Sequence, residues 1–456
     1  MTGSSSAVSG QQTGSGIKRV LTRRDLIFFG LVILTPTAPY PVYGIIQQVS
    51  WGHAALSYLV AMVAMLFTAA SYARMAVAYP SAGSTYTYVQ QTIGPFIGFL
   101  AGWAMILDYF LIPLESVIYA AITAARLLPA IPYFAWVFLF TAAVTLVNVR
   151  GIRLMACANT AMMIVMTGCA LLFIGFAVHN VAVRFGIAYI FSPRALVQSE
   201  SLALQPLMLG AGIATLSYIG FDAISTLAED TIDPRRDIGF STIFVCVLQT
   251  LICVLTVYLA SLVWSNYHSF PEAETAILDI GRRAGGAFLF ALITFVLLVA
   301  GLASALTGQA GVSRLLFAMG RDRVIPASVF SYIHPRHGTP TRAIWVVSGL
   351  TLTGALFIRF QSAVELLNFG AFVGFILVNV SVIYHYFIRL HLRKGKYLLE
   401  NLFVPLCGAS VCCYVWMNLS DKAKVMGFLW LGIGGVYLCV LTRGFRRVPT
   451  KLEFER

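Results

Sequence analysis

Carboxylates inside apolar segments are the residues of this sequence with the clearest capacity for chemistry. Asp108 and Glu115 fall in one apolar run, seven residues apart, so a helix would present both on one face, two turns apart. Asp222 falls in a second run. A charged side chain at the centre of a membrane helix costs about 2.5–3.5 kcal/mol on insertion scales, so it needs a partner or a function. Carboxylates gathered around a cavity would neutralise the ammonium group of an organic cation.

Aromatic side chains near these acids would complete such a site through contacts between the cation and the ring faces. The candidates are Tyr40, Tyr43, Tyr109, Tyr218 and Phe221. Each acid also has a structural alternative. Asp222 could cap a broken helix, Asp108 could bond a neighbouring helix, and Glu115 could be solvated near the outer surface.

Other kinds of chemistry lack their motifs. The seven histidines lie in loops or near the ends of apolar runs without an HExxH sequence, and no phosphate-binding G-x-x-x-x-G-K-[ST] sequence occurs. The eight cysteines lie in or beside apolar runs without a CxxC spacing, which predicts small buried hydrophobic residues. We therefore expect no metal site, no cofactor, no ATP-driven pump and no soluble enzyme.

The elements that must position the acids follow from the composition. The chain has 456 residues, of which 59% are hydrophobic and 11% are charged, whereas soluble domains carry about 25% charged residues. So few charges cannot cover the outside of a water-soluble protein of this size. The sequence therefore predicts an all-α membrane protein that crosses the bilayer many times.

Apolar runs of about 20 residues, each long enough for a membrane-spanning helix, occur twelve times. They cover about residues 26–49, 54–78, 96–126, 133–149, 155–179, 205–228, 240–263, 285–317, 341–358, 363–387, 399–418 and 424–443. Residues 1–25 are predicted to be a disordered N-terminal tail, and residues 444–456 a C-terminal tail.

The basic residues predict the orientation. With the N-terminus inside, the cytoplasmic loops collect 23 of the 31 Lys and Arg residues, and cytoplasmic loops are the ones enriched in these residues. Both termini are therefore predicted to be cytoplasmic. The net charge of +13 has the same origin and does not indicate a nucleic-acid partner.

Two of the twelve runs contain residues that interrupt a helix. The first holds three prolines and a glycine between Thr35 and Gly44, and the sixth holds Gly220 beside Asp222. Two ordinary kinked helices are one explanation, but breaks at matching positions of two halves are typical of inverted-repeat transporters. We predict a five-plus-five inverted repeat with broken helices 1 and 6. Its parts are spans 1–5 (about 26–179) and spans 6–10 (about 206–387) in a core of 26–390, followed by spans 11 and 12 in 391–443.

Three motifs resemble the amino acid–polyamine–organocation superfamily of permeases. Residues 79–103, which begin YPSAGSTYTY and continue to GF and GW, are similar to the family's P-x-A-G-x-Y-x-Y … G-F-x-x-G-W. Residues 220–235, from GFD through AED to DPR, resemble its G-F-[DE] … x-E-[DE] … P-x-R. Residues 313–340, from SRLLFAMGRD to TP, resemble its R-x-x-[YF]-x-M-[GA]-R-D … P … T-P. The matches cover roughly residues 26–390.

Within the superfamily, residues 107–109 (LDY) and 368–371 (NFGA) are most similar to the bacterial putrescine importers, which implies a bacterial inner membrane. The first break departs from the family pattern in two ways. It is rich in Pro and Tyr where amino acid permeases carry a glycine-rich G-S/A-G-I, and Pro41 stands where the putrescine importers carry Asp. Glu115 is the candidate to replace that acid.

The resemblance implies a substrate site lined by spans 1, 3, 6, 8 and 10. The implied residues are Pro39, Tyr40, Tyr43, Gly44, Asp108, Tyr109, Glu115, Ser217, Tyr218, Gly220, Phe221, Asp222 and Asn368. It also implies a cytoplasmic gate in which Glu229 pairs with loop arginines, Arg314 being a candidate. Ser304 and Thr307 lie where sodium-coupled relatives build an ion site, although small polar residues also mediate helix packing. Because titratable acids are present, protons are favoured over sodium.

The sequence thus predicts a secondary transporter that imports a small organic amine resembling putrescine, or an amino acid, by alternating access. An exchanger of amine against product is an alternative. A nutrient sensor would usually add a long cytoplasmic domain, an integral enzyme would show a His/Asp cluster at a membrane face, and a channel would show flux that does not saturate. The expected partners are the solute, the coupling ion and the lipid bilayer.

Overall fold

The computed structural model describes residues 21–80, 84–150, 153–193, 196, 202–228, 231–321, 325–335, 338–442 and 444. Across these residues the regular structure is helical, apart from one isolated parallel bridge between Leu21 and Thr231. Ten of the described helices are long and apolar enough to cross a membrane. They are α3 (Ala54–Ala78), α5 (Pro95–Leu127), α6 (Tyr133–Arg150), α7 (Arg153–Phe185), α8 (Leu204–Ala214) with the short helices after it, α9 (Pro234–Val263), α10 (Ala276–Arg321), α13 (Phe360–Val382) with a π-helical end at Ile383–Arg389, α15 (Val404–Met417) with α14 (Lys396–Leu398) before it, and α16 (Asp421–Leu441).

The first apolar run is divided where its prolines lie. α1 (Arg23–Leu34) ends at Thr35, whose φ of 51° is left-handed, and α2 (Tyr43–Val49) begins eight residues later. The prolines between these helices bring no amide hydrogens. Short turns therefore replace the helical bonds, such as Ala38 N–H donating to the Thr35 carbonyl at 3.1 Å.

The sixth run is divided around Gly220. α8 is followed by two tight 3-10 helices, η3 (Thr215–Tyr218) and η4 (Phe221–Leu227). Gly220 stands between them with a φ of 114°, which residues with a side chain rarely adopt. A Cβ at this position would lie 2.2 Å from Cγ2 of Ile33 in α1. The two interruptions are therefore in contact, and only glycine fits the contact.

Several boundaries differ from the sequence prediction. α1 begins at Arg23, inside the predicted tail of residues 1–25, and α9 begins at Pro234 rather than near residue 240. The segment after the second run, which was predicted to be a loop, contains the short helix α4 (Ser84–Thr92). α10 begins at Ala276 rather than near residue 285, because charged residues in its first turns interrupt the apolar run. Gly285 and Gly286 are non-helical inside α10, with a φ of 66° at Gly286, so the predicted start coincides with a kink.

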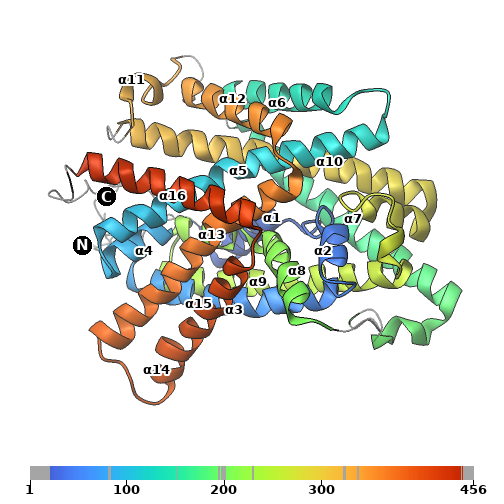
Figure 1. Cartoon of the computed structure of the whole chain (residues 1–456), viewed down its shortest axis with the longest axis horizontal. Coiled ribbons are helices and arrows are strands. Elements are labelled where there is room, and N and C mark those ends of the chain that lie inside the picture. Colours follow the sequence, from blue (N-terminus) through green and yellow to red (C-terminus); the bar gives the residue numbers. More distant parts are fainter. Residues whose placement is uncertain are drawn as a thin grey trace, which may run out of the picture.

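The helices pack around α3 and α5. α3 lies along α9, and α5 lies along both α10 and α13. Figure 1 shows α6 beside α12 (Thr341–Phe357) at one edge of the bundle, and α16 across α5 and α13. Buried polar bonds join some of these helices, as where Gln309 of α10 donates to Ser348 at 2.8 Å and accepts from Asn148 at 2.7 Å. Such bonds connect helices whose surroundings offer no water.

Two tryptophans fasten α16 to α5. The indole nitrogen of Trp103 donates to the Trp430 carbonyl oxygen, and the indole nitrogen of Trp430 donates to the Trp103 carbonyl oxygen, both at 2.9 Å. The two rings stack with centroids 5.0 Å apart. Phe99 and Tyr437 extend the stack, since both rings stack on Trp103 and on each other. Each indole thus satisfies its one donor within apolar surroundings.

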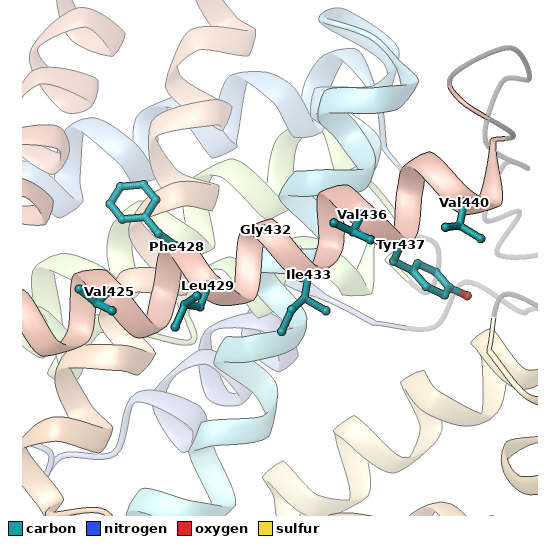
Figure 2. A pocket seen from close by; sticks show the side chains of 8 residues that line it. All are labelled: Val425, Phe428, Leu429, Gly432, Ile433, Val436, Tyr437 and Val440. Carbon is teal, nitrogen blue, oxygen red and sulfur yellow. The ribbon is translucent and has the colours of Figure 1, made fainter.

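The outer face of α16 is apolar and open. Figure 2 shows side chains from Val425 to Val440 along a groove of about 880 Å³. The groove is lined by eight residues of this one helix, namely Val425, Phe428, Leu429, Gly432, Ile433, Val436, Tyr437 and Val440. Exposed apolar surface of this extent is expected where a protein meets lipid. Because its lining is apolar, the groove is not expected to be a site for a polar solute.

Candidate functional site

Asp222 lies at the start of η4, in the interruption of the sixth run. Its side chain is buried, with 4% of its surface exposed. The left-handed turn at Gly220 points the Gly220 N–H back toward the carboxylate, whose Oδ1 accepts it at 3.3 Å. Ser225 donates its hydroxyl hydrogen to the Asp222 carbonyl oxygen at 2.6 Å, which stabilises the tight turn. The break thus presents a carboxylate in the interior of the bundle.

Asp108 lies on α5 and faces the same region. It is 3% exposed, and its buried Oδ1 has no hydrogen-bond partner in the part of the chain that the structure describes. The α13 backbone comes close at Gly370, where a Cβ would lie 2.7 Å from the Ala104 carbonyl oxygen and 3.6 Å from the Asp108 Cβ. Phe375, five residues further along α13, stacks on Phe221 next to Asp222. The same stretch of α13 therefore contacts the segments that carry both acids.

Aromatic rings form a wall beside Asp222. Phe221 stacks on Phe375 of α13 with centroids 5.2 Å apart, and Tyr72 of α3 lies nearly perpendicular to Phe221 with centroids 5.5 Å apart. Tyr88 of α4 contacts Tyr72 at 6.0 Å. The Tyr72 hydroxyl shares a hydrogen bond of 2.5 Å with Thr85. Of these rings only Phe221 was predicted, so the structure adds Tyr72, Tyr88 and Phe375 to the candidate site.

The carbonyl oxygen of Tyr109 is a second polar group on α5, next to Asp108. Tyr109 lies within the field of both Asp108 and Asp222. Pro113 lies inside α5, four residues further along. Because proline has no N–H, the Tyr109 carbonyl oxygen loses its helical donor and is free to accept a bond from another group. A cation beside Asp108 would find this oxygen on the same helix.

The aromatic residues of the first break contact other helices. The ring of Tyr40 lies 5.7 Å from Phe173 of α7. The Tyr43 hydroxyl bonds Ser261 of α9 at 3.2 Å. A Cβ at Gly44 would lie 2.1 Å from the Ala273 carbonyl oxygen, so this glycine allows α2 to approach the segment before α10. Pro39 is buried within the turns of the break. These contacts do not include Asp108 or Asp222.

Three further predicted residues stabilise the sixth-run break. The Ser217 hydroxyl shares a hydrogen bond of 2.9 Å with the Tyr58 hydroxyl of α3, and Tyr218 donates to the Tyr58 carbonyl oxygen at 3.4 Å. Asn368 of α13 donates to the Gly212 carbonyl oxygen at 2.7 Å, near the end of α8. The structure thus gives these side chains partners in neighbouring helices.

Glu115 lies on α5 between Asp108 and the end of the helix that bears Arg126. Ser116 donates to Glu115 Oε1 at 3.0 Å. Tyr119, one turn further along, lies within the field of both Glu115 and Glu274, which precedes α10. Burial raises the pKa of Glu274, the neighbouring Glu272 raises it further, and Arg359 opposes the shift. We call Asp222, Asp108, Glu115 and Glu274 the acidic row.

Ion pairs tie the bundle at both ends. At one end Arg23 of α1 contacts Asp237 of α9 at 2.6 Å, and its guanidinium lies 4.6 Å above the Phe240 ring. At the other end Arg126 of α5 pairs with Glu272 at 2.8 Å and also with Asp279 of α10. Neither pair was predicted, because each joins segments far apart in the sequence.

The predicted gate consists of Glu229 and Arg314. Glu229 and the side chain of Arg314 lie outside the part of the chain that the structure describes. Thr307 and Ser304 both lie on α10 and are half-buried. The Thr307 hydroxyl donates to the Ala303 carbonyl oxygen of its own helix at 2.9 Å. That bond is the ordinary one for a threonine inside a helix.

Comparison with known proteins places these features in context. The family model for amino acid permeases matches residues 42–432. The low-affinity putrescine importer PlaP of Escherichia coli K12 is 34% identical over 444 residues, covering 96% of each chain. The branched-chain amino acid permease BcaP of Bacillus subtilis is 27% identical, covering 96% of this chain and 95% of the relative. The methylthioribose transporter of B. subtilis is 24% identical, covering 96% of each.

Proposed function

The chain belongs to the amino acid permease family, and from that premise we propose that it imports a small organic amine of the putrescine type. A neutral or cationic amino acid is the second candidate, since one of the similar permeases is named for branched-chain amino acids. Import is driven by protons and proceeds by alternating access in the inner membrane. The observation that carries the proposal is the buried pair of Asp108 and Asp222 beside an aromatic wall.

The charge of the site favours an ammonium group over a carboxylate. Asp108 and Asp222 bring two carboxylates to one buried region, with tyrosines as their neighbours. A substrate carboxylate there would be repelled by like charges, whereas an ammonium group is stabilised by carboxylates and by ring faces. The Gly220 amide, which could have bound a substrate carboxylate at the start of η4, is already bonded to Asp222.

The fold that we propose for transport has twelve spans. It adds the divided first run (α1 with α2) and the 17-residue α12 to the ten longer helices. Spans 1–5 and 6–10 form two inverted halves in the core of residues 26–390, and spans 11 and 12 follow it. The contact between Gly220 and Ile33 supports this arrangement, because it joins the two interruptions at one place. Both termini then lie in the cytoplasm, as the loop charges favour.

Proton coupling follows from the acidic row. Asp108 and Glu115 lie two turns apart on one face of α5, so the row provides acids that can hold a proton between its Glu274 end and Asp222. Binding of an ammonium group at Asp108 and Asp222 favours their ionised forms, so the proton that enters with the substrate is held at another acid of the row, for which Glu115 is the candidate. Glu115 takes the role of the acid that the family resemblance implies at position 41.

The experiment is uptake of labelled putrescine into proteoliposomes under an imposed inward proton gradient, with unlabelled amines and amino acids as competitors. We expect saturable uptake that collapses with the gradient and that amines compete. Asp222→Asn and Asp108→Asn should each lower uptake at least tenfold at unchanged membrane expression. Asp421→Asn is the matched control, because that side chain is 96% exposed at the start of α16. Full uptake in both buried variants would refute the assignment, and competition by amino acids alone would replace the amine with the second candidate.

A further inference from the structure

One amide side chain connects both interrupted runs. Gln249 lies in the middle of α9 and is fully buried. Its Nε2 lies 3.1 Å from the Leu34 carbonyl oxygen, 2.9 Å from that of Thr35 and 3.3 Å from that of Ser217. Leu34 and Thr35 end α1, and Ser217 lies in η3 after α8. A third helix therefore supplies the donor for the ends of two broken ones.

These three carbonyl oxygens need a positive partner. The last carbonyls of a helix have no amide in their own helix to accept from, and they form the negative end of its dipole. Here two such ends converge in the interior of a membrane protein, where water cannot satisfy them. The Thr35 carbonyl also accepts from Ala38 N–H at 3.1 Å. Without Gln249, three partial negative charges would face one another.

The orientation of the amide is determined by its surroundings. If the amide were turned around, Oε1 would face three carbonyl oxygens, and all four atoms would be acceptors. In the orientation found, Oε1 is buried without a hydrogen-bond partner among the described residues. The Oε1 atom therefore makes no bond that would stabilise this position. The contribution of Gln249 to the fold comes from the bonds that Nε2 donates to the three carbonyl oxygens.

We propose that Gln249 is a positioning residue that takes the place of a bound monovalent cation between the two breaks. Helix ends and unwound carbonyls of this kind hold sodium in many secondary transporters. An amide gives the same oxygens a fixed partner that does not exchange with the solution. The proposal rests on the proposed transport function, and it adds that the interruptions are held together without sodium. Sodium then has no role at this place in the wild-type protein.

The test exchanges the amide for groups that leave the oxygens unpaired. Gln249→Glu replaces the amide donor with an oxygen, so the buried carboxyl group must either keep a proton or bind a cation beside the three carbonyl oxygens. The melting experiment is therefore run at alkaline pH, where the protonated form is least favoured. We expect sodium chloride, compared with choline chloride at equal concentration, to raise the melting temperature of purified Gln249→Glu by at least 5 °C and that of the wild type by less than 1 °C. Gln249→Ala, which opens space at the same oxygens, gives a second chance to see the sodium response if the glutamate variant does not fold.

Gln309→Glu is the matched control for a buried carboxylate. Gln309 is also fully enclosed, but its Nε2 contacts the hydroxyl groups of Ser348 and Thr145, and Asn148 donates to its oxygen. Hydroxyls can turn and donate to a carboxylate, whereas carbonyls cannot. Gln309→Glu should therefore show no sodium-specific stabilisation.

The outcomes separate this inference from the proposed function. A sodium response in either Gln249 variant, absent from the wild type and from Gln309→Glu, supports the inference even if putrescine is not the substrate, because melting needs no substrate. Equal sodium responses in all proteins, or none in either Gln249 variant, would overturn it. For whichever substrate the wild type accumulates, uptake by Gln249→Glu should also become sodium-dependent.

Discussion

Replacing Gly220 with alanine is expected to destabilise the junction of the two breaks by about 2–5 kcal/mol. The φ of 114° is left-handed, and such a conformation costs a residue with a side chain about 1–2 kcal/mol. The added methyl group would lie 2.2 Å from Cγ2 of Ile33, and overpacking of this kind costs about 1–3 kcal/mol. The two effects are independent, because one concerns the backbone and the other a neighbouring side chain.

A second substitution separates the two contributions. Ile33→Ala removes Cγ2 and leaves the Ile33 Cβ 3.5 Å from the new methyl group, an ordinary contact distance. The double variant should therefore be more stable than the sum of the single changes by about 1–3 kcal/mol, with the backbone cost remaining. Gly168→Ala is the control, because its added methyl group meets no atom within 4 Å and the residue lies inside α7.

The assay is equilibrium unfolding of the purified variants in mixed micelles, with uptake measured in parallel. Gly220→Ala should lose both stability and uptake, and Gly168→Ala should keep both. Wild-type stability of Gly220→Ala, or the absence of any recovery in the double variant, would refute the argument that the two breaks meet at this glycine.

Three further predictions concern charges near the ends of the bundle. Asp237→Asn removes the charged partner of Arg23 and should loosen the contact between α1 and α9. In a variant whose only cysteine is the buried Cys246, thiol reagents should then label Cys246 faster. Unchanged labelling would contradict the role of this pair. Arg126→Lys keeps the charge but not the forked contact with two acids, and should lower stability by about 1 kcal/mol. The pKa of Glu274 is raised from its ordinary 4.5 by burial, so its ionised form is disfavoured in the folded state. Glu274 contributes fully to the free energy of unfolding below pH 4.5, and this contribution is lost as the pH rises through the raised pKa. Glu274→Gln should make the melting temperature less dependent on pH across that interval. An unchanged pH profile would show that Glu274 is not the group responsible.

Local chemistry explains what the sequence could predict. An apolar run long enough to cross a bilayer is visible without any knowledge of its neighbours, and a proline interrupts a helix wherever it occurs. For the same reason Asp108 and Asp222 could be identified as buried acids, since their runs contain few other charges. The helical segments and the main acids therefore follow from the residues themselves.

The contacts of the site depend on packing between distant segments and could not be predicted in this way. Tyr40 lies in an irregular turn and Tyr43 begins α2 directly after it, so no helical periodicity continuing from α1 tells which way either side chain points. Tyr72 and Phe375 meet Phe221 only because α3 and α13 pack beside η4. Gln249 did give a signal, as an amide in the middle of an apolar run, but its three carbonyl partners appear only in the folded chain.

The reciprocal tryptophan bonds impose an order on biosynthesis. Trp103 and Trp430 are 327 residues apart in the chain, and a ribosome adds about 5–20 residues per second. Roughly 16–65 seconds therefore separate the emergence of the two indoles. During this interval α5 has already been made, and the Trp103 N–H lacks the Trp430 carbonyl oxygen to which it donates in the finished protein. Maturation of the α5 surface is thus completed only after α16 has been made.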